Sequence, residues 1–248
     1  MTRTRPCVVV FGREPAAGEV KTRLAAGIGG AAAARVYAIT LEHTLEAAVE
    51  SGAGVVLSLA AAPSSEWGLG IECTIEVQGT GDLGDRMVDA FDRRFSEGEE
   101  RVIIIGSDCP LITPEHLQAA ADALAENDVV LGPAVDGGYW LVAQRRPGVD
   151  LFSDIPWSSH DTLETTRRRL AGIGAAWTEL EELRDVDTRE DLEAALEDPR
   201  VPKMLADRMR AAKHGLSQSL SESLSVSKPQ IDSVHLDSDS DSDSDCDS

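Results

Sequence analysis

The sequence predicts an α/β protein with a mostly parallel sheet and helices on both of its faces. Strand-like and helix-like segments alternate regularly over residues 7–132, as a doubly wound sheet requires. Residues 101–105 form an almost uninterrupted β-branched run, typical of a strand buried on both faces. The length of 248 residues suits one large domain of this class.

The expected strands are short apolar or alternating segments bounded by glycine, proline or polar residues. Residues 71–78 alternate between apolar and polar as a partly exposed strand does, and residues 175–180 form a candidate edge strand. The full set spans residues 7–12, 54–60, 71–78, 101–105 and 128–132, a strand after the glycine-rich turn within 133–143, and 175–180.

The expected helices lie at residues 31–51, after residue 84, and at 117–124, 162–170 and 189–196. The inner face of the second is expected to hold four apolar residues, Met87, Val88, Phe91 and Phe95. Thr113, which precedes Pro114, and Thr188 are the predicted N-caps of the third and fifth helices.

The folded domain is expected to cover residues 1–200. Residues 201–248 are predicted to be a low-complexity acidic Ser/Asp tail that is disordered. Beyond Pro202 the chain offers an amphipathic stub and then the Ser/Asp alternation of residues 237–245, which buries too little apolar surface to fold. Weak calcium binding, phosphorylation and a purely solvating role are the three alternatives for this tail.

The charge balance is strongly acidic, with a formal net charge of −21. Residues 1–200 alone carry 18 Lys and Arg against 35 Asp and Glu, so the tail is not the cause. A lysine-poor, acidic surface predicts a halophilic host, where salt screens the self-repulsion. Without a basic face to neutralise phosphates, a nucleic-acid partner is not expected.

The cysteines and the apolar segments predict a cytoplasmic protein. The four cysteines, at positions 7, 73, 109 and 246, are scattered and form no CxxC pair, which favours a reduced compartment. No segment approaches the roughly 18 apolar residues of a membrane span. The N-terminal apolar run is too short for a signal peptide and is assigned to the first strand. The sequence does not indicate an oligomeric state.

The loop after the first strand is the first candidate ligand site. Gly12 and Gly18 allow tight backbone turns, and Lys21 and Arg23 lie near the start of a helix. Backbone N–H groups and two cations suit a polyphosphate, although the spacing matches neither a Walker A loop nor GxGxxG. Lys21 is the only lysine in the first 200 residues, and the helix dipole disfavours a lysine there. A functional role is therefore favoured over a surface lysine.

A second candidate loop contains Gln78, Gly79 and Gly84, whose glycines allow close approach of a flat base or a ribose. Gly-Asp pairs are also ordinary turn residues. The loop is therefore predicted to bind a nucleotide only in combination with the other sites.

Carboxylates form the remaining candidate sites. Asp108 leaves the central strand at the edge where open α/β sheets bind ligands, and it is predicted to hold Mg²⁺ or Mn²⁺ or, alternatively, to cap the loop. Asp185 and Asp187 alternate on an extended segment, so both could reach one cation, or Asp187 could cap the last helix. Asp136 is expected to face a second substrate. Together these groups predict metal-assisted transfer from a nucleotide, driven by positioning and electrostatics.

Five motifs follow one another in a recognisable order, at residues 15–24, 78–84, 106–111, 132–141 and 185–188. They resemble the arsenosugar-biosynthesis-type glycosyltransferase family of the nucleotide-diphospho-sugar transferase (GT-A) superfamily. More distantly they are similar to phospholactate and molybdenum-cofactor guanylyltransferases. The resemblance covers about residues 7–196 and excludes the tail.

The resemblance implies a single GT-A-like (Rossmann-like) domain in which Lys21 and Arg23 bind the nucleotide phosphates. It also implies that Asp108 binds the metal, aided by Asp185 or Asp187. The residues implied to take part in catalysis are Asp108, Lys21 and Asp136. Those expected to bind the acceptor or sugar are Asp136, Gly137, Gly138, Tyr139 and Trp157.

Three functions stay open at this point. Superfamily glycosyltransferases usually hold their cation with an Asp-x-Asp pair, whereas residues 107–109, Ser-Asp-Cys, offer one Asp and look more like a nucleotidyltransferase. The favoured function is glycosyl transfer from a nucleotide sugar to a small-molecule acceptor. The second is transfer from an NTP to a phosphorylated small molecule with release of pyrophosphate, and the third is nucleotide binding without turnover.

Overall fold

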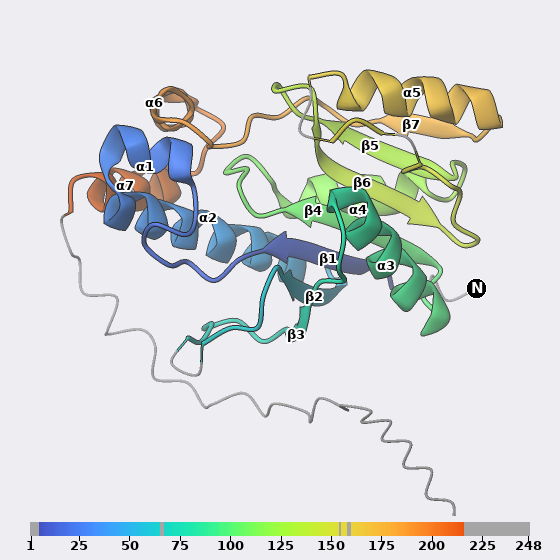
Figure 1. The fold of residues 1–248 in the computed structure, drawn as a ribbon, viewed down its shortest axis with the longest axis horizontal. Coiled ribbons are helices and arrows are strands. Elements are labelled where there is room, and N and C mark those ends of the chain that lie inside the picture. Colours follow the sequence, from blue (N-terminus) through green and yellow to red (C-terminus); the bar gives the residue numbers. More distant parts are fainter. Residues whose placement is uncertain (1–4, 65–66, 154, 158–159, 216–248) are drawn as a thin grey trace, which may run out of the picture.

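The computed structural model describes residues 5–64, 67–153, 155–157 and 160–215 (Figure 1). The tail predicted to be disordered spans residues 201–248, and its part from residue 216 onward lies outside this set. The strands are β1 (Cys7–Gly12), β2 (Gly54–Leu59), β3 (Thr74–Val77), β4 (Arg101–Gly106), β5 (Val129–Pro133), β6 (Tyr139–Arg145) and β7 (Trp177–Glu179). The helices are α1 (Thr22–Ile28), α2 (Gly30–Glu50), α3 (Leu83–Ser96), α4 (Pro114–Ala123), α5 (Thr162–Ile173), α6 (Arg189–Glu197) and α7 (Lys203–Lys213).

One seven-stranded sheet forms the centre of the fold, in the order β3-β2-β1-β4-β6-β5-β7. β6 runs antiparallel to its neighbours β4 and β5, and the other pairings are parallel. The chain order reverses direction across the sheet between β1 and β4, and open α/β sheets bind ligands at such a point. The predicted mostly parallel α/β sheet is confirmed, and β6 is the strand predicted after the glycine-rich turn.

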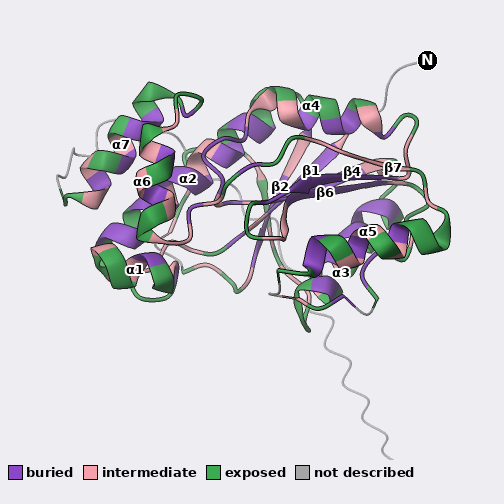
Figure 2. Cartoon of the chain, turned by 90° about the horizontal axis from the view of Figure 1, so that it is seen from above, coloured by how far each residue is buried: buried purple, intermediate pink, exposed green. Residues whose placement is uncertain are grey.

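Helices cover both faces of the sheet (Figure 2). β1 shows why: Val8 and Val10 join the core beneath α2 and α4, while Cys7 and Val9 join the core beneath α3 and α5. Successive side chains of a strand point to opposite faces, so a strand that is apolar throughout needs cover on both sides. The unbroken apolar runs of β1 and β4 therefore dictate the layered architecture.

Two details of the predicted elements are wrong. The third strand was expected over residues 71–78, but β3 spans only Thr74–Val77 and forms the sheet edge. Val88 was expected to face the core, but it is exposed, whereas Met87, Phe91 and Phe95 of the same helix are buried. The helix periodicity places Met87, Phe91 and Phe95 within one stripe, and Val88 lies at its margin.

The folded part extends past the predicted boundary at residue 200. Helix α7 buries Leu205, Ala206 and Met209 in the same core as α2, and Arg208 pairs with Glu42 of α2. The amphipathic stub folds because α2 offers an apolar face for it to cover. Among the described helices, none is long and apolar enough to cross a membrane.

Candidate functional site

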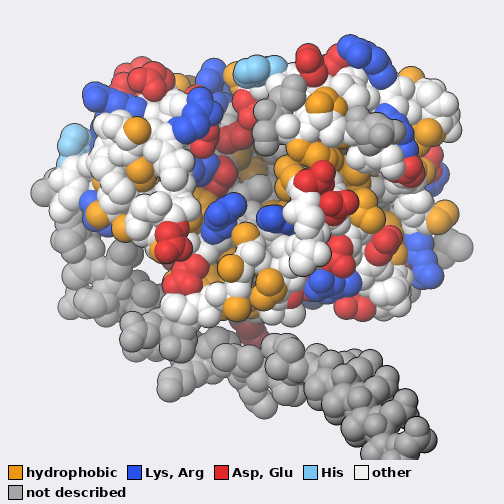
Figure 3. Space-filling view, viewed as in Figure 1, with side chains coloured by type: hydrophobic (Ala, Val, Ile, Leu, Met, Phe, Trp, Pro, Cys, Tyr) orange, Lys and Arg blue, Asp and Glu red, His pale blue; other side chains and the backbone are white. Residues whose placement is uncertain are grey.

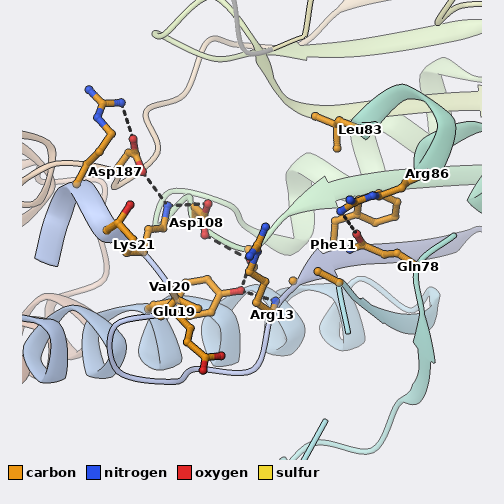
Figure 4. A pocket seen from close by; sticks show the side chains of 16 residues that line it. Phe11, Arg13, Glu19, Val20, Lys21, Gln78, Leu83, Arg86, Asp108 and Asp187 are labelled. Atoms are coloured by element: carbon orange, nitrogen blue, oxygen red, sulfur yellow. Dashed lines mark hydrogen bonds and ion pairs between the residues drawn. The ribbon is translucent and has the colours of Figure 1, made fainter. Parts of the chain in front are cut away.

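A pocket of about 460 Å³ opens where the first four strands end (Figure 4). Gly12 ends β1, Ala60 follows β2, Gln78 follows β3 and Ser107 follows β4, and all four line the pocket. Parallel strands place their carboxyl ends at one edge, so segments far apart in the sequence meet here. In the space-filling view, basic side chains gather in the middle of this face with acidic ones around them (Figure 3).

Lys21 projects into the pocket from the N-cap of α1. Its backbone is left-handed (φ 50°, ψ 50°), and it is the only non-glycine residue with positive φ in the described parts of the chain. This conformation costs a non-glycine residue roughly 1–2 kcal/mol, and such strain concentrates at functional sites. The Lys21 side chain is 9% exposed, and its Nζ lies 2.7 Å from Asp108 Oδ2 and 3.8 Å from Asp187 Oδ1.

Asp108 is held at the end of β4 by a chain of hydrogen bonds. The Arg13 backbone N–H donates to the Tyr37 hydroxyl (2.8 Å), which lies 3.0 Å from Ser107 Oγ. Ser107 Oγ in turn donates to Asp108 Oδ1 (3.4 Å). Burial and the charge of Asp108 raise the pKa of Tyr37 to about 12, so the phenol keeps its proton and donates it towards Ser107.

The side chains of Asp185 and Asp187 lie in different environments although the two residues are only two positions apart. The buried Val186 between them donates its N–H to the Asp108 carbonyl (2.9 Å) and fixes the segment beside β4. Asp187 faces the pocket and pairs with Arg23 (2.6 Å). Thr188, as predicted, is the N-cap of α6, so the alternative of Asp187 as that cap is wrong.

Asp185 lies deeper than Asp187, and its Oδ1 is buried without a hydrogen-bond partner in the described structure. Burial, then the charges of Asp136 and Asp108, raise the pKa of Asp185 to about 7, against the opposing effect of Lys21. A buried carboxylate oxygen that has no hydrogen-bond partner and lies among other carboxylates is a suitable ligand for a hard divalent cation.

No cluster of three or more His, Cys, Asp or Glu side chains is arranged to hold a metal within the described residues. Mg²⁺ sites often use only one or two protein carboxylates and take their other oxygens from phosphate and water. Asp108 and Asp185 fit a site of this kind.

The segment that carries these carboxylates is anchored at Glu181. Trp140 Nε1–H donates to the Glu181 carbonyl (3.1 Å), and His116 Nε2 lies 2.7 Å from Glu181 Oε1. The Thr113 backbone N–H donates to His116 Nδ1 (3.1 Å), so the neutral ring carries its proton on Nε2 and donates it to Glu181. Helix α4 and β6 thereby fix the start of the segment.

The glycines of the second candidate loop have packing reasons for their lack of a side chain. A Cβ on Gly79 would lie 2.7 Å from Asp89 Oδ2, and one on Gly84 would lie 2.5 Å from the Trp157 indole. Neither glycine lines the pocket, but Gln78 does. Gln78 Nε2 donates to the Ser58 carbonyl (2.8 Å), which fixes the orientation of its amide.

The residues expected at the acceptor lie beside the pocket and not in its lining. Asp136 is exposed, and its Oδ1 accepts the Gly138 N–H (2.9 Å) across a turn in which Gly137 has φ 90°. Tyr139 and Trp157 meet edge to face, with ring centroids 6.4 Å apart. Asp136 raises the pKa of Asp185, so this group adjoins the deeper carboxylate.

The structure therefore divides the predicted site residues. Those that line the pocket are Gly12, Lys21, Arg23, Gln78, Asp108 and Asp187. Those outside its lining are Gly18, Gly79, Gly84, Asp136, Gly137, Gly138, Tyr139, Trp157 and Asp185. Burial raises the pKa of the Cys109 thiol to about 12, so this thiol next to Asp108 stays protonated and is a poor nucleophile.

The sequence analysis did not predict ten of the residues that line the pocket, which are Phe11, Arg13, Glu19, Val20, Thr22, Tyr37, Ala60, Leu83, Arg86 and Ser107. Arg13 and Ser107 directly follow the strands β1 and β4, and a search of the first residue after each strand would have found them. Tyr37 carries no such signal, because it lies within the apolar stripe of α2.

Residues 41–159 match a family model described as "Uncharacterized protein conserved in bacteria (DUF2064)". The structure is similar to the crystal structure of a candidate nucleotide-diphospho-sugar transferase from Desulfovibrio desulfuricans G20, with 27% sequence identity and a TM-score of 0.75. That similarity covers 85% of this chain and 97% of the other. The chain thus has an α/β nucleotide-sugar transferase-like fold.

A nucleotidyl transferase from Methanothermobacter shares the fold at 14% identity and a TM-score of 0.50, over 77% of this chain and 95% of the other. No curated protein matches this chain in sequence.

Proposed function

We propose that the protein is a divalent-metal-dependent transferase that uses a nucleotide-activated donor and passes a sugar from a nucleotide sugar to a small acceptor. The observation that carries the proposal is the pocket at the strand ends, where the strained and nearly buried Lys21 meets Asp108. Similarity to the Desulfovibrio protein supports the same class of donor.

Lys21, Arg23 and the neighbouring Arg13 are the proposed ligands of the donor's phosphates. Arg13 and Lys21 lie on the loop between β1 and α1, and Arg23 lies in the first turn of α1. All three line one cavity in a chain with 44 acidic and 23 basic residues. Cations in a partly enclosed site bind phosphate oxygens more strongly than cations in water do. Gly12 and Gly18 keep the backbone of this loop compact, and Gln78 lies at the other end of the pocket.

The proposed cofactor is Mg²⁺ or Mn²⁺, held by Asp108 and Asp185 with Asp187 next to them. When bound, it supplies positive charge that neutralises the charge developing on the leaving diphosphate. Lys21 Nζ lies 2.7 Å from Asp108 Oδ2, so the ammonium and a cation held by Asp108 would lie side by side against the donor's phosphates.

Asp136 is the proposed proton acceptor for the attacking hydroxyl of the second substrate. Its carboxylate is exposed and its backbone is pinned by the turn at Gly137 and Gly138. Tyr139 and Trp157 form the proposed apolar support for the acceptor or the sugar.

Nucleotidyl transfer is the second candidate function. It is favoured by the single carboxylate of residues 107–109, where a paired Asp-x-Asp is typical of superfamily glycosyltransferases. The donor would then be an NTP and the acceptor a phosphorylated small molecule.

The reaction product separates the two functions. The protein is incubated in high KCl with Mn²⁺ and either a panel of nucleotide sugars or a panel of NTPs with phosphorylated small molecules. Release of a nucleoside diphosphate supports glycosyl transfer, and release of pyrophosphate supports nucleotidyl transfer. Metal-dependent nucleotide binding without either product across the panels would contradict both and indicate a binding module.

A further inference from the structure

The pocket has two ends of different chemistry (Figure 4). Lys21, Asp108 and Asp187 make one end ionic. The opposite end is lined by Phe11, Gln78, Leu83 and Arg86, which include no carboxylate. A nucleotide has the same asymmetry, with charge on its phosphates and a flat, uncharged base at the other end.

Arg86 is held in place by neutral groups. Its Nε donates to the Gly81 carbonyl (3.1 Å), and its Nη1 donates to Gln78 Oε1 (3.4 Å). Because Gln78 Nε2 is already committed to Ser58, the amide presents its oxygen to Arg86. Arg86 Nη2 has no hydrogen-bond partner within the described residues, so the guanidinium is oriented and keeps free donors.

Arg86 also lacks an ion pair with any described carboxylate. Arg93, about two turns further along α3, differs in this respect, because it forms an ion pair with Asp89 at 2.7 Å. In so acidic a chain, a pocket guanidinium without a carboxylate partner is available for an electron-rich group of a ligand.

Two apolar side chains line the same end of the pocket as Arg86. Leu83, at the start of α3, is 45% exposed although it lines the pocket. Phe11 of β1 lies at the same end and is partly exposed. An apolar ligand surface is expected where large apolar side chains remain uncovered in a pocket, and a nucleobase offers a flat face for them.

We infer that this end of the pocket is the base subsite and that Arg86 selects a base with a keto oxygen, guanine or uracil, over the amino bases adenine and cytosine. The inference rests on the proposed function as a nucleotide-dependent transferase. A guanidinium only donates hydrogen bonds. Guanine presents O6 and N7 as adjacent acceptors and uracil presents a keto oxygen, whereas adenine and cytosine place an amino donor at the corresponding ring position. Donor then faces donor, which disfavours the amino bases.

The test compares GDP, UDP, ADP and CDP by calorimetric titration in high KCl with Mn²⁺. Wild-type protein is expected to bind GDP or UDP about 10- to 100-fold more tightly than ADP and CDP. Arg86→Met keeps the aliphatic stem and removes the donors, so it is expected to abolish most of this preference while changing ADP and CDP affinity less than about threefold. Arg93→Met is the matched control, because it removes the same charge from the same helix outside the pocket, and it is expected to preserve the preference.

The outcomes separate this inference from the proposed function. Equal affinity for all four nucleotides, or a preference for ADP or CDP, overturns the base assignment and leaves nucleotide binding intact. An Arg86→Met variant that weakens all four equally places Arg86 on the phosphates and also overturns it. Failure of every nucleotide to bind the folded wild-type protein overturns the proposed function together with the inference.

Discussion

Two groups of charged side chains share Asp108. They differ in whether each charge has an oppositely charged side chain close to it. In the pocket, Lys21, Arg23, Asp108 and Asp187 each lie within 4 Å of an opposite charge. Behind it, Asp185 keeps a buried oxygen without a described partner, and Asp136 and Asp108 add negative charge around it. The pocket group is balanced without a ligand, whereas the deeper group has an excess of negative charge that a divalent cation would neutralise.

The largest expected effect comes from Lys21→Met. Methionine retains the stem and a Cβ, so the left-handed backbone is strained in both proteins, and only the charge is lost. Nucleoside diphosphate affinity is expected to fall about 100-fold, equivalent to about 2.7 kcal/mol, because the phosphates lose a charged donor. Calorimetric titration measures the affinity, and a change below about threefold would show that Lys21 serves Asp108 and not the phosphates.

The deeper group is tested by pH in the absence of divalent cations. Because the pKa of Asp185 is raised to about 7, the folded protein holds a proton that the unfolded chain releases above its ordinary carboxyl pKa. The free energy of unfolding contributed by Asp185 is therefore highest in acid and falls as pH rises to about 7, by at most about 1.4 kcal/mol per pH unit. Asp185→Asn removes this dependence.

Urea unfolding of wild type and Asp185→Asn, from about pH 4 to about pH 8, measures the difference. Carboxyl groups with lowered pKa values, such as Asp128 and Asp150, affect both proteins alike and cancel. The variant is expected to gain relative stability as pH rises. Parallel stability curves would show that Asp185 is not protonated in the folded protein.

The substitution Gly84→Ala tests whether Gly84 lies against the nucleotide or packs against the core. The added Cβ would lie 2.5 Å from Trp157, so the variant is expected to lose about 1–3 kcal/mol of unfolding free energy. Gly172→Ala, in α5 with nothing within 4 Å of its Cβ, is the control and should be neutral or slightly stabilised. A loss of nucleotide affinity without loss of stability would instead place Gly84 against the ligand.

The smallest effect is expected for Arg23→Ala. Arg23 is 72% exposed, and its ion pair with Asp187 is open to solvent, so the pair contributes at most about 1 kcal/mol to stability. Thermal unfolding is therefore expected to change little. Nucleotide affinity is expected to fall less than in Lys21→Met, because water screens the contact of an exposed cation with the phosphates. A loss of affinity as large as that of Lys21→Met would show that both cations contact the phosphates equally.

The sheet and the position of Asp108 could be predicted because local patterns determine them. β-branched runs marked β1 and β4, and Thr113 with Pro114 marked the start of α4. The different environments of Asp185 and Asp187 could not be predicted from their alternate spacing. They arise from Val186, whose burial and hydrogen bond to the Asp108 carbonyl are tertiary contacts.

Helix α7 and the orientation of Arg86 in the pocket escaped prediction for a related reason. The sequence shows that residues 203–213 are amphipathic, but only the packed α2 shows where Met209 is buried. Likewise Arg86 looks like an ordinary helix arginine until Gln78 and Gly81 are seen to orient it. Gly79 and Gly84, in contrast, attracted attention as glycines although side-chain packing accounts for them.

The most direct test titrates a nucleoside diphosphate into wild type and Asp108→Asn, with and without Mn²⁺. Asparagine preserves the shape of Asp108 and removes the charge that is proposed to bind the cation. The account predicts that Mn²⁺ strengthens nucleotide binding to the wild type by at least about tenfold and has no such effect on the variant, with both proteins folded. Equal strengthening by Mn²⁺ in both proteins would contradict the assignment of the metal to Asp108.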